Sequence, residues 1–305
     1  RLSEKLQVTF SAGKRQNTMG NAPSEPAPPS LELEKPWRKF DWRQKNELKK
    51  RLEEFSVSHP DVKCINILVA GQIGAGKSSF INSVNNTFQE RMTSSALVDS
   101  CGGTSFTKEL KVHRVRGVKG DLPFYLSDIM GLEAKILAGT LPEDVIKTIY
   151  GYVRDEYKFN PEMSISDKNQ DYVNDPSLSN QAFCLVYVVD AKTVQYIDQG
   201  LIDKLKIIRH AISHDRIPQV IVMTKVDEAC PLVKEDLRKI YTSKKIKEKM
   251  EMCSEAIGVP VNCNFPVKNY CEEIDVDDDV DVLILKAIDQ IVNLANDRLR
   301  DRASE

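Results

Sequence analysis

The chain has 305 residues, of which 41% are hydrophobic, so it can form one large domain with a sizeable core. Its 43 basic and 45 acidic residues give a formal net charge of −2, which excludes the basic excess typical of nucleic-acid-binding proteins. Seven cysteines without a Cys-x-x-Cys pair suit a reducing compartment, and no apolar run approaches the roughly 20 residues that span a bilayer. We therefore expect a cytoplasmic protein with no nucleic-acid partner.

Residues 1–36 are rich in Pro, Ser and Glu and lack periodicity, which predicts a disordered tail. Within this tail, Met19-Gly-Asn-Ala-Pro-Ser24 matches M-G-x-x-x-[ST], the signal for myristoylation of Gly20 if translation starts at Met19. Residues 1–18 would then be an untranslated leader, and one acyl chain would give weak membrane contact. An incidental Met-Gly pair in a low-complexity tail is the alternative.

Apolar residues at helical spacing between Trp37 and Phe55 predict an amphipathic lead-in helix within 37–58. The domain proper is expected to cover residues 59–305. Its first half predicts the strand 62–70, the helix 77–90, a hairpin of 108–116 with 122–127, and the helix 142–154. The polar stretch 155–181 that follows is interpreted as an insertion.

Residues 182–189 are almost continuously apolar, as in a parallel strand that is buried on both faces. The second half further predicts the helix 197–212, the strand 219–223, a charged helical segment 231–257, the strand 259–267 and the helix 282–299. Strands that alternate with helices indicate a three-layer α/β/α fold, with a mostly parallel central sheet and one antiparallel hairpin strand. The segment 231–257 is interpreted as a second insertion, and effector contacts or self-association are expected at the two insertions.

A glycine-rich loop separates the first predicted strand from the first predicted helix. Gly71-Gln-Ile-Gly-Ala-Gly-Lys-Ser-Ser79 fits G-x-x-x-x-G-K-[ST] and has the flanks that a phosphate-binding loop requires. Its backbone N–H groups and the helix N-terminus would surround a polyphosphate, Lys77 would reach the outer phosphates as a catalytic group, and Ser78 would bind Mg²⁺. The predicted nucleotide contacts in the loop are Gly71, Gly74, Ala75, Gly76, Lys77, Ser78 and Ser79.

Two further segments suit the phosphate end of a nucleotide. Asp128-Ile-Met-Gly131 follows the second hairpin strand, so Asp128 would hold Mg²⁺ and Gly131 would offer its N–H to the γ-phosphate. In the polar loop before the hairpin, Thr104 is predicted to be a switch residue that ligates Mg²⁺ and takes part in catalysis. Thr107 is the alternative for that role.

The identity of the nucleotide base is predicted to be guanine from Thr224-Lys-Val-Asp227, which follows a buried strand and fits [NT]-K-x-D. The two carboxylate oxygens of Asp227 can accept from guanine N1–H and its 2-amino group, whereas adenine would leave them unpaired. Lys225 would cover the base, and Thr224 stands in place of the commoner Asn. After the last strand, Lys268 and Asn269 are expected beside the base, with Asn269 as the contact. The predicted cofactors are GTP or GDP and Mg²⁺.

These signals, in this order, are those of Ras-like P-loop G domains. The segments 71–83, Gly102-Gly-Thr-Ser-Phe106, 127–132 and Phe265-Pro-Val-Lys-Asn-Tyr270 resemble those of the interferon-induced protein 44 family, and the resemblance runs from about Trp37 to the C-terminus. It implies a GTP-binding, interferon-induced, cytoplasmic protein of the antiviral or immune response. Longer family members carry a TLDc-type domain before the G domain, so the chain resembles a short form without it.

One departure from the small-GTPase pattern concerns catalysis. Many small GTPases place a water-orienting Gln after D-x-x-G, but Leu132 and Glu133 stand here. We therefore expect weak intrinsic GTP hydrolysis unless a partner, a second copy of the chain or Glu133 supplies the missing group. The alternatives are a scaffold that binds GTP or GDP without hydrolysis and, against Asp227, an ATP-using P-loop enzyme.

Two metal motifs are incomplete. The acidic run 275–281 resembles a calcium loop, but Val280 stands at the turn glycine and Lys286 at the bidentate Glu, so the run is read as a lead-in to the last helix. His210 and His214 are four residues apart but have no acidic or Cys partner nearby in sequence. Neither motif predicts a metal site.

Overall fold

The computed structural model describes residues 30–94, 96, 108–135 and 137–302. By its contacts the chain divides at Ser30, and the fold below is that of the second unit, Leu31–Glu305. Met19, Gly20, Thr104 and Thr107 lie outside the described residues. Myristoylation and the switch threonine therefore stay predictions.

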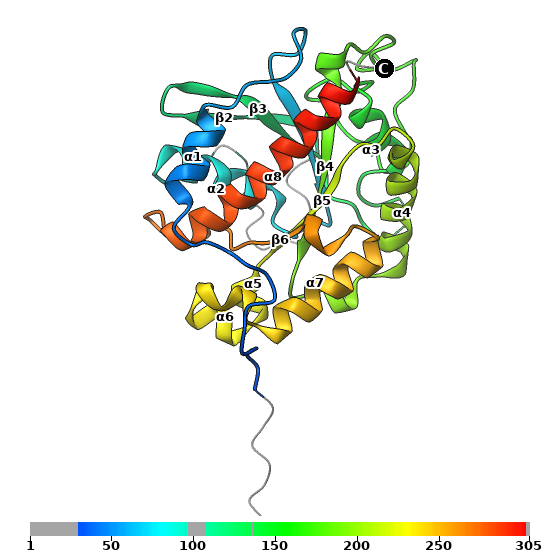
Figure 1. The fold of residues 1–305 in the computed structure, drawn as a ribbon. Coiled ribbons are helices and arrows are strands. Elements are labelled where there is room, and N and C mark those ends of the chain that lie inside the picture. The colour runs from blue at the N-terminus through cyan, green and yellow to red at the C-terminus, as the bar shows by residue number, and fades with distance from the viewer. Residues whose placement is uncertain (1–29, 95, 97–107, 136, 303–305) are drawn as a thin grey trace, which may run out of the picture. The chain divides into compact units, whose positions relative to one another are not determined.

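Within the described residues, one six-stranded sheet has the order β2-β3-β1-β4-β5-β6 (Figure 1). The β2–β3 hairpin is antiparallel, and every other neighbouring pair is parallel. The strands are β1 (Ile65–Gly71), β2 (Lys111–Gly117), β3 (Gly120–Asp128), β4 (Ala182–Asp190), β5 (Gln219–Thr224) and β6 (Asn264–Pro266).

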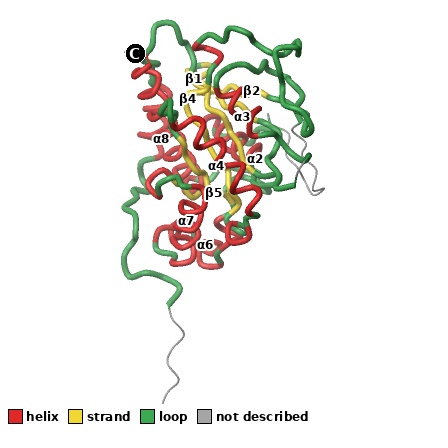
Figure 2. The backbone as a smooth tube through the Cα atoms, turned by 90° about the vertical axis from the view of Figure 1, so that its right-hand side faces the viewer, coloured by secondary structure: helices red, strands yellow, loops and turns green. Residues whose placement is uncertain are grey.

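Helices cover both faces of this sheet (Figure 2). On one face lie α2 and α8, with α1 packed on α8, and on the other lie α3 and α4, with α7 beside α4. The helices are α1 (Lys45–Glu53), α2 (Lys77–Gln89), α3 (Pro142–Ile149), α4 (Gln199–Ser213), α5 (Val226–Ala229), α6 (Pro231–Glu235), α7 (Lys244–Ile257) and α8 (Asp278–Arg302). The predicted three-layer fold with a mostly parallel sheet is confirmed.

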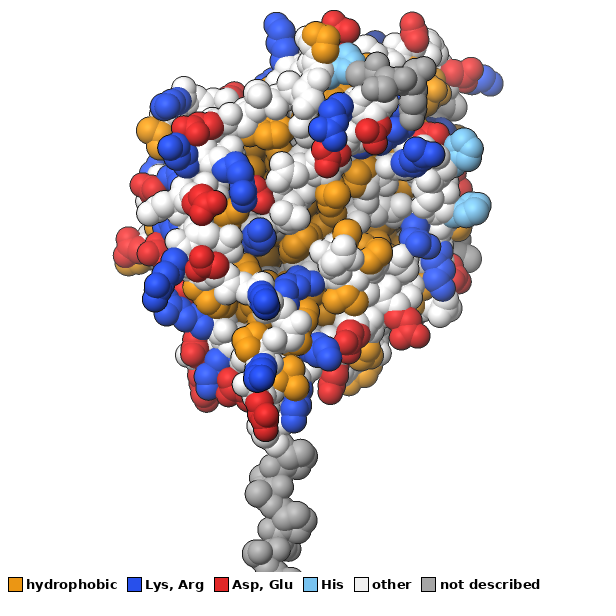
Figure 3. Space-filling model, viewed as in Figure 1, with side chains coloured by type: hydrophobic (Ala, Val, Ile, Leu, Met, Phe, Trp, Pro, Cys, Tyr) orange, Lys and Arg blue, Asp and Glu red, His pale blue; other side chains and the backbone are white. Residues whose placement is uncertain are grey.

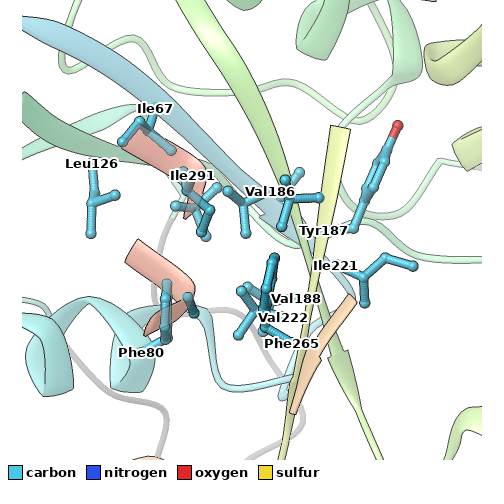
Figure 4. Packing of buried hydrophobic residues seen from close by; sticks show 14 of the residues in the cluster. Ile67, Phe80, Leu126, Val186, Tyr187, Val188, Ile221, Val222, Phe265 and Ile291 are labelled. Carbon is cyan, nitrogen blue, oxygen red and sulfur yellow. The ribbon is translucent and has the colours of Figure 1, made fainter. Parts of the chain in front are cut away.

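The core lies between the sheet and its helices. In β4 every residue from Ala182 to Val189 is buried, as the apolar run predicts. Figure 4 shows side chains of several strands clustered with Phe80 of α2 and Ile291 of α8, and these side chains are buried. Each large apolar side chain that is fully buried contributes about 1.5–3 kcal/mol. This packing holds the carboxyl ends of the strands in fixed positions.

The predicted helical segment 231–257 is interrupted. The Asp236 side chain accepts the N–H of Arg238 and starts a separate 3₁₀ turn, Leu237–Tyr241. Ser243 then caps α7 by accepting the N–H of Ile246 at 3.2 Å. Short polar side chains that bond to nearby backbone groups end one helix and begin another, so the charged sequence forms three pieces.

The lead-in helix is also shorter than Trp37–Phe55, because α1 begins at Lys45. Before α1, the Arg38 guanidinium donates to the carbonyl oxygens of Val261 and Asn264 at 2.6 and 2.8 Å. These contacts with the segment around β6 hold the backbone at Arg38 outside any helix. Tertiary contacts therefore override the helical spacing of the apolar residues.

Residues 31–36, which the sequence analysis places in the tail, contact the domain. The N–H of Leu33 donates to the carbonyl of Thr242 at 2.8 Å, and the N–H of Trp37 donates to that of Tyr241 at 3.0 Å. The ring of Trp37 packs edge-on against that of Tyr241. This part of the chain therefore forms a strap beside α7.

The segment 155–181 has little regular structure and is held by hydrogen bonds to several neighbouring parts of the chain. Asp144 of α3 accepts the N–H of Ile165 at 2.9 Å. The N–H of Leu110 donates to the carbonyl of Tyr157 at 2.9 Å, so the start of the segment lies along the chain that enters β2. The segment is tied to α3 and to the edge of the sheet.

On the face shown in Figure 3, Lys and Arg side chains are interspersed with Asp and Glu side chains. This mixture is what the near-balance of acidic and basic residues leads us to expect. Among the described helices, none combines the length and the apolar character that crossing a membrane requires.

Candidate nucleotide-binding site

The predicted motifs meet at one edge of the sheet. Parallel strands end at a common edge, and β1, β3, β4, β5 and β6 end there. The residues at or just after these ends are Gly71, Asp128, Asp190, Thr224 and Asn269. Ligands of open α/β sheets bind in the crevice outside the carboxyl ends of the strands, so the topology gathers motifs that are far apart in sequence.

The loop between β1 and α2 requires glycine at two positions in particular. Gly71 has φ +152°, and a Cβ there would lie 2.3 Å from the Val188 carbonyl oxygen. Gly76 has φ +91°, and a Cβ there would lie 3.0 Å from Asn269 Nδ2. The first glycine lets β1 pass close to β4, and the second lets the loop enter α2 beside the segment after β6.

Lys77 opens α2 and is 6% exposed. Its Nζ donates to the carbonyl oxygens of Gly71 and Gln72, both at 3.2 Å. Burial lowers the pKa of the Lys77 ammonium, and the negative charges of Asp128 and Glu133 offset part of that effect. An anion held by the loop would stabilise the charged form of this lysine.

Ser78 and Asp128 face each other across the loop. The Ser78 hydroxyl donates to Asp128 Oδ2 at 2.8 Å, and Asp128 is 1% exposed. A hydroxyl and a carboxylate are the hard oxygen ligands that Mg²⁺ prefers. In the described parts of the chain, no group of three or more His, Cys, Asp and Glu side chains is arranged to hold a metal. A cation here would therefore take further oxygens from water or phosphate.

The backbone after Asp128 lies against the loop. A Cβ at Gly131 would approach Ile73 Cγ1 to 2.5 Å and Ile73 N to 2.8 Å, so only glycine fits. The N–H of Leu132 donates to the Gly71 carbonyl at 3.0 Å, and its side chain is fully buried. Leu132 is therefore a core residue. The carbonyl of Glu133 accepts from the Lys204 ammonium at 2.6 Å.

A pocket of about 380 Å³ adjoins the loop where the base-reading motif was predicted. This volume lies in the range of ligand pockets. It is lined by Gly76, Ser79, Lys225, Asp227, Glu228, Lys234, Lys268, Asn269, Tyr270, Cys271, Glu272 and Glu273. The structure thus brings Asp227 and Asn269 together with the end of the phosphate loop.

Thr224 has a different position from the one expected of a base contact. It is fully buried, and its hydroxyl donates to the carbonyl of Ala75 at 2.6 Å. It is not among the residues that line the pocket. The Thr224 hydroxyl, which replaces the commoner Asn amide, therefore stabilises the phosphate loop by a hydrogen bond to its backbone.

Lys225 joins the loop to β4. Its Nζ donates to the Gly74 carbonyl at 2.7 Å and pairs with Asp190 Oδ2 at 2.8 Å. Its backbone is left-handed, with φ +56°. Sequence reasoning missed Asp190, although an acidic residue at the end of a buried parallel strand was a usable signal. The ion pair aligns the Lys225 side chain along the wall of the pocket.

Lys268 and Glu273, which also line the pocket, form an ion pair of 2.7 Å. Burial alone would raise the pKa of Glu273, but the N–H of Cys271 and the Lys268 ammonium lower it to about 2. Burial would lower the pKa of Lys268, whereas its pairing with Glu273 raises it above the ordinary value. The ion pair thus links the start of the segment after β6 to a residue five positions later in the same segment.

The depressed pKa of Glu273 predicts an acid-dependent contribution to stability. It is fully present above the ordinary pKa of 4.5 and is lost as the pH falls toward about 2. We expect Glu273→Gln to flatten the loss of stability over that window, as measured by urea unfolding between pH 5 and 2. The exposed neighbour provides a control, Glu272→Gln, which should keep the wild-type slope. Equal slopes for wild type and Glu273→Gln would contradict the prediction.

The phosphate loop, the strand order and the edge at which the motifs meet define a P-loop α/β fold of the G-domain class. No protein-family model matches the chain. Among curated proteins it is 36% identical over 242 residues to human (Homo sapiens) interferon-induced protein 44, which covers 79% of this chain and 54% of that protein. It is 30% identical over 239 residues to human interferon-induced protein 44-like, which covers 78% and 53%. Over this shared part the chain is similar to the interferon-induced protein 44 and 44-like proteins.

The predicted resemblance is thereby confirmed, and the chain spans about half the length of the curated relatives it matches. Among solved structures it is similar to a probable GTP-binding protein engB, with a TM-score of 0.43, 12% identity and coverage of 76% of this chain and 99% of that one. It is also similar to Toc33 from Arabidopsis thaliana in complex with GDP and Mg²⁺, with a TM-score of 0.45, 15% identity and coverage of 83% and 91%.

Proposed function

We propose that the chain binds GTP and GDP. The observation that carries this proposal is the position of Asp227 on a pocket that begins at Gly76, the last glycine of the phosphate loop. A carboxylate there matches the adjacent N1–H and 2-amino donors of guanine. Adenine presents no such pair of donors. When adenine binds, the Asp227 carboxylate would lose its water without gaining hydrogen-bond partners in return. An ATP-using enzyme is disfavoured for that reason.

We propose Mg²⁺ as the accompanying metal, held through the Ser78 hydroxyl and the Asp128 carboxylate. Their 2.8 Å contact places two oxygen ligands beside the loop. The ion would supply positive charge that neutralises charge on the phosphates during transfer. Lys77 would add a second positive charge from the first turn of α2, and Thr104 is the proposed switch ligand.

Hydrolysis is proposed to be slow. Leu132 is fully buried and apolar, so it can neither reach nor orient a water molecule. Chemistry would then depend on a group from a second copy of the chain, from a partner or from Glu133, and the protein would act as a switch. The buried leucine also supports a second candidate function, a scaffold that binds guanine nucleotide without turnover.

The names of the relatives support a proposal for the biological setting. The human proteins that match the chain are named interferon-induced. We therefore propose a cytoplasmic role in the innate immune, antiviral response, with self-association through the G domain and with effectors at the segments 155–181 and 231–257. The proposed partners are guanine nucleotide, a second copy of the chain and protein effectors.

Nucleotide binding and turnover test these proposals together. We expect Mg²⁺-dependent binding of GTP and GDP, binding of ATP weaker by about 10³-fold, and single-turnover hydrolysis whose rate constant rises with protein concentration. Isothermal titration and quenched-flow assays, with EDTA as the control for Mg²⁺, measure these quantities. ATP that binds as tightly as GTP would contradict the base assignment. Binding of GTP without hydrolysis at any protein concentration would contradict the proposed GTPase activity and would favour the non-hydrolysing scaffold.

A further inference from the structure

A buried hydrogen-bonded network stands behind one wall of the pocket, formed by Tyr270, Asp281, Thr87 and Lys45. We propose that Tyr270 and Asp281 are positioning residues for the nucleotide base: they hold the wall that carries Asn269 at a fixed place relative to the phosphate loop. This inference rests on the proposed binding of guanine nucleotide. It assigns a role at the site to residues that no sequence motif marks.

Tyr270 is anchored by both its backbone and its side chain. It lines the pocket and is 7% exposed. Its N–H donates to Ser83 Oγ at 2.9 Å, which ties it to α2. Its hydroxyl donates to Asp281 Oδ1 at 2.7 Å and accepts the N–H of Asp277 at 2.7 Å. The phenol is thus clamped at the start of α8.

Asp281 is the centre of the network. It lies in the first turn of α8 and is fully buried. Thr87 Oγ1 of α2 lies 2.7 Å from Oδ1, and Lys45 Nζ of α1 lies 2.8 Å from Oδ2. A buried carboxylate is stable only when nearby charge and hydrogen bonds compensate the loss of water. The contacts to Asp281 are therefore needed for its stability, and they fix the positions of the groups that make them.

The network and the phosphate loop share one helix. α2 begins at Lys77, and farther along it carries Ser83 and Thr87. The wall formed by Asn269 and Tyr270, called the Tyr270 wall below, is therefore positioned against α2, the same helix that carries the phosphate-binding Lys77. Asn269, the neighbour of Tyr270, donates through Nδ2 to the Gly76 carbonyl at 3.1 Å, which joins the wall to the loop directly.

The network also explains two features that the sequence analysis left without a site role. The acidic run 275–281 supplies both Asp277 and Asp281, so it is more than a lead-in to the last helix. The lead-in helix α1 supplies Lys45, which also pairs with Asp278. Through Lys45, α1 becomes part of the structure that supports the base pocket.

Contacts to phosphate come from the loop and Lys77, whereas contacts to the base come from the walls of the pocket. Loosening the Tyr270 wall should therefore weaken the binding of a nucleotide but leave the binding of a base-free polyphosphate unchanged. A mutation that merely destabilised the whole fold would weaken both. This difference separates positioning from a general structural role.

The test uses the full chain with Tyr270→Phe, which keeps the ring, and Asp281→Asn. We expect the affinity for GDP to fall about tenfold in each variant, and the affinity for inorganic tripolyphosphate to stay within about twofold, by titration calorimetry with Mg²⁺. The matched control is Tyr150→Phe, which loses a Tyr–Asp hydrogen bond of 2.6 Å to Asp215, beyond the end of α4. It should leave both affinities unchanged.

Unchanged GDP affinity in Tyr270→Phe would overturn the inference, and so would an equal loss for GDP and tripolyphosphate. Should Asp281→Asn fail to fold, Tyr270→Phe still decides the question, since thermal unfolding will show whether it is folded. A wild-type protein that binds no guanine nucleotide would refute the proposed function itself and the inference with it. Wild-type binding together with unaltered variants would refute only the inference.

Discussion

Replacing Lys77 by alanine should abolish measurable binding of GTP and GDP, with a loss of affinity of at least about 10²-fold. The ammonium is 6% exposed and lies in the first turn of α2, where its neighbours are the loop carbonyls of Gly71 and Gln72. A charge-assisted contact to phosphate in so dry a place is worth about 2–5 kcal/mol. Alanine supplies neither charge nor donor.

Titration with a fluorescent GDP analogue and with GTP measures this loss. The matched control is Lys49→Ala, which removes another buried lysine, 7% exposed and paired with Glu90 at 2.6 Å at the far end of α2. The control should bind nucleotide like the wild type, even where its thermal stability is lower. Normal affinity in folded Lys77→Ala would remove the loop from its proposed role.

Replacing Asp227 by asparagine should lower the preference for GTP over ATP by about 10³-fold, mainly through weaker GTP binding. An amide cannot present two acceptors to the N1–H and 2-amino groups of guanine. Xanthine carries an oxygen in place of the 2-amino group, and an amide can donate to that oxygen. The same variant is therefore expected to gain affinity for xanthosine triphosphate.

Competition titrations with GTP, ATP and xanthosine triphosphate measure the change. Glu228→Gln is the control, since Glu228 is an exposed carboxylate that lines the same pocket and pairs with Lys192. It should keep the wild-type order of affinities. An unaltered ratio of GTP to ATP binding in Asp227→Asn would show that another group reads the base.

The main features of this site were predictable because their signals are local. The loop motif joins a strand to a helix, and Asp227 follows a buried strand at fixed spacing. Once the strands are parallel, their carboxyl ends must meet, so the convergence of the two motifs follows from topology. Tyr270 was missed because its partner, Asp281, is identified only by the folded structure. Asp190 was missed although its place at the end of a buried strand was a usable signal.

The fold shows the same division between local and distant causes. The strands predicted over 182–189 and 219–223 and the helix after the loop are found close to their predicted ranges. The strand predicted over 259–267 is wrong in its length, because Val261–Cys263 forms a 3₁₀ turn and only Asn264–Pro266 pairs with β5. The helix predicted from Trp37 begins only at Lys45, and Arg38 before it bonds to carbonyl groups more than 200 residues away. The break near Asp236 does have a local cause, but capping side chains look like ordinary polar residues of a charged helix.

The two margins of the sheet bear on how copies of the chain can associate. Just before β2 begins, the backbone of Leu110 exchanges hydrogen bonds with Glu156 and Tyr157, and β6 at the other margin has only three residues and ends at Pro266. Short, covered or proline-bearing edges are poor templates for another strand. Growth into a shared intermolecular sheet is therefore disfavoured at the β6 margin. Copies of the chain that meet at that margin should therefore do so through side-chain contacts, without strand pairing.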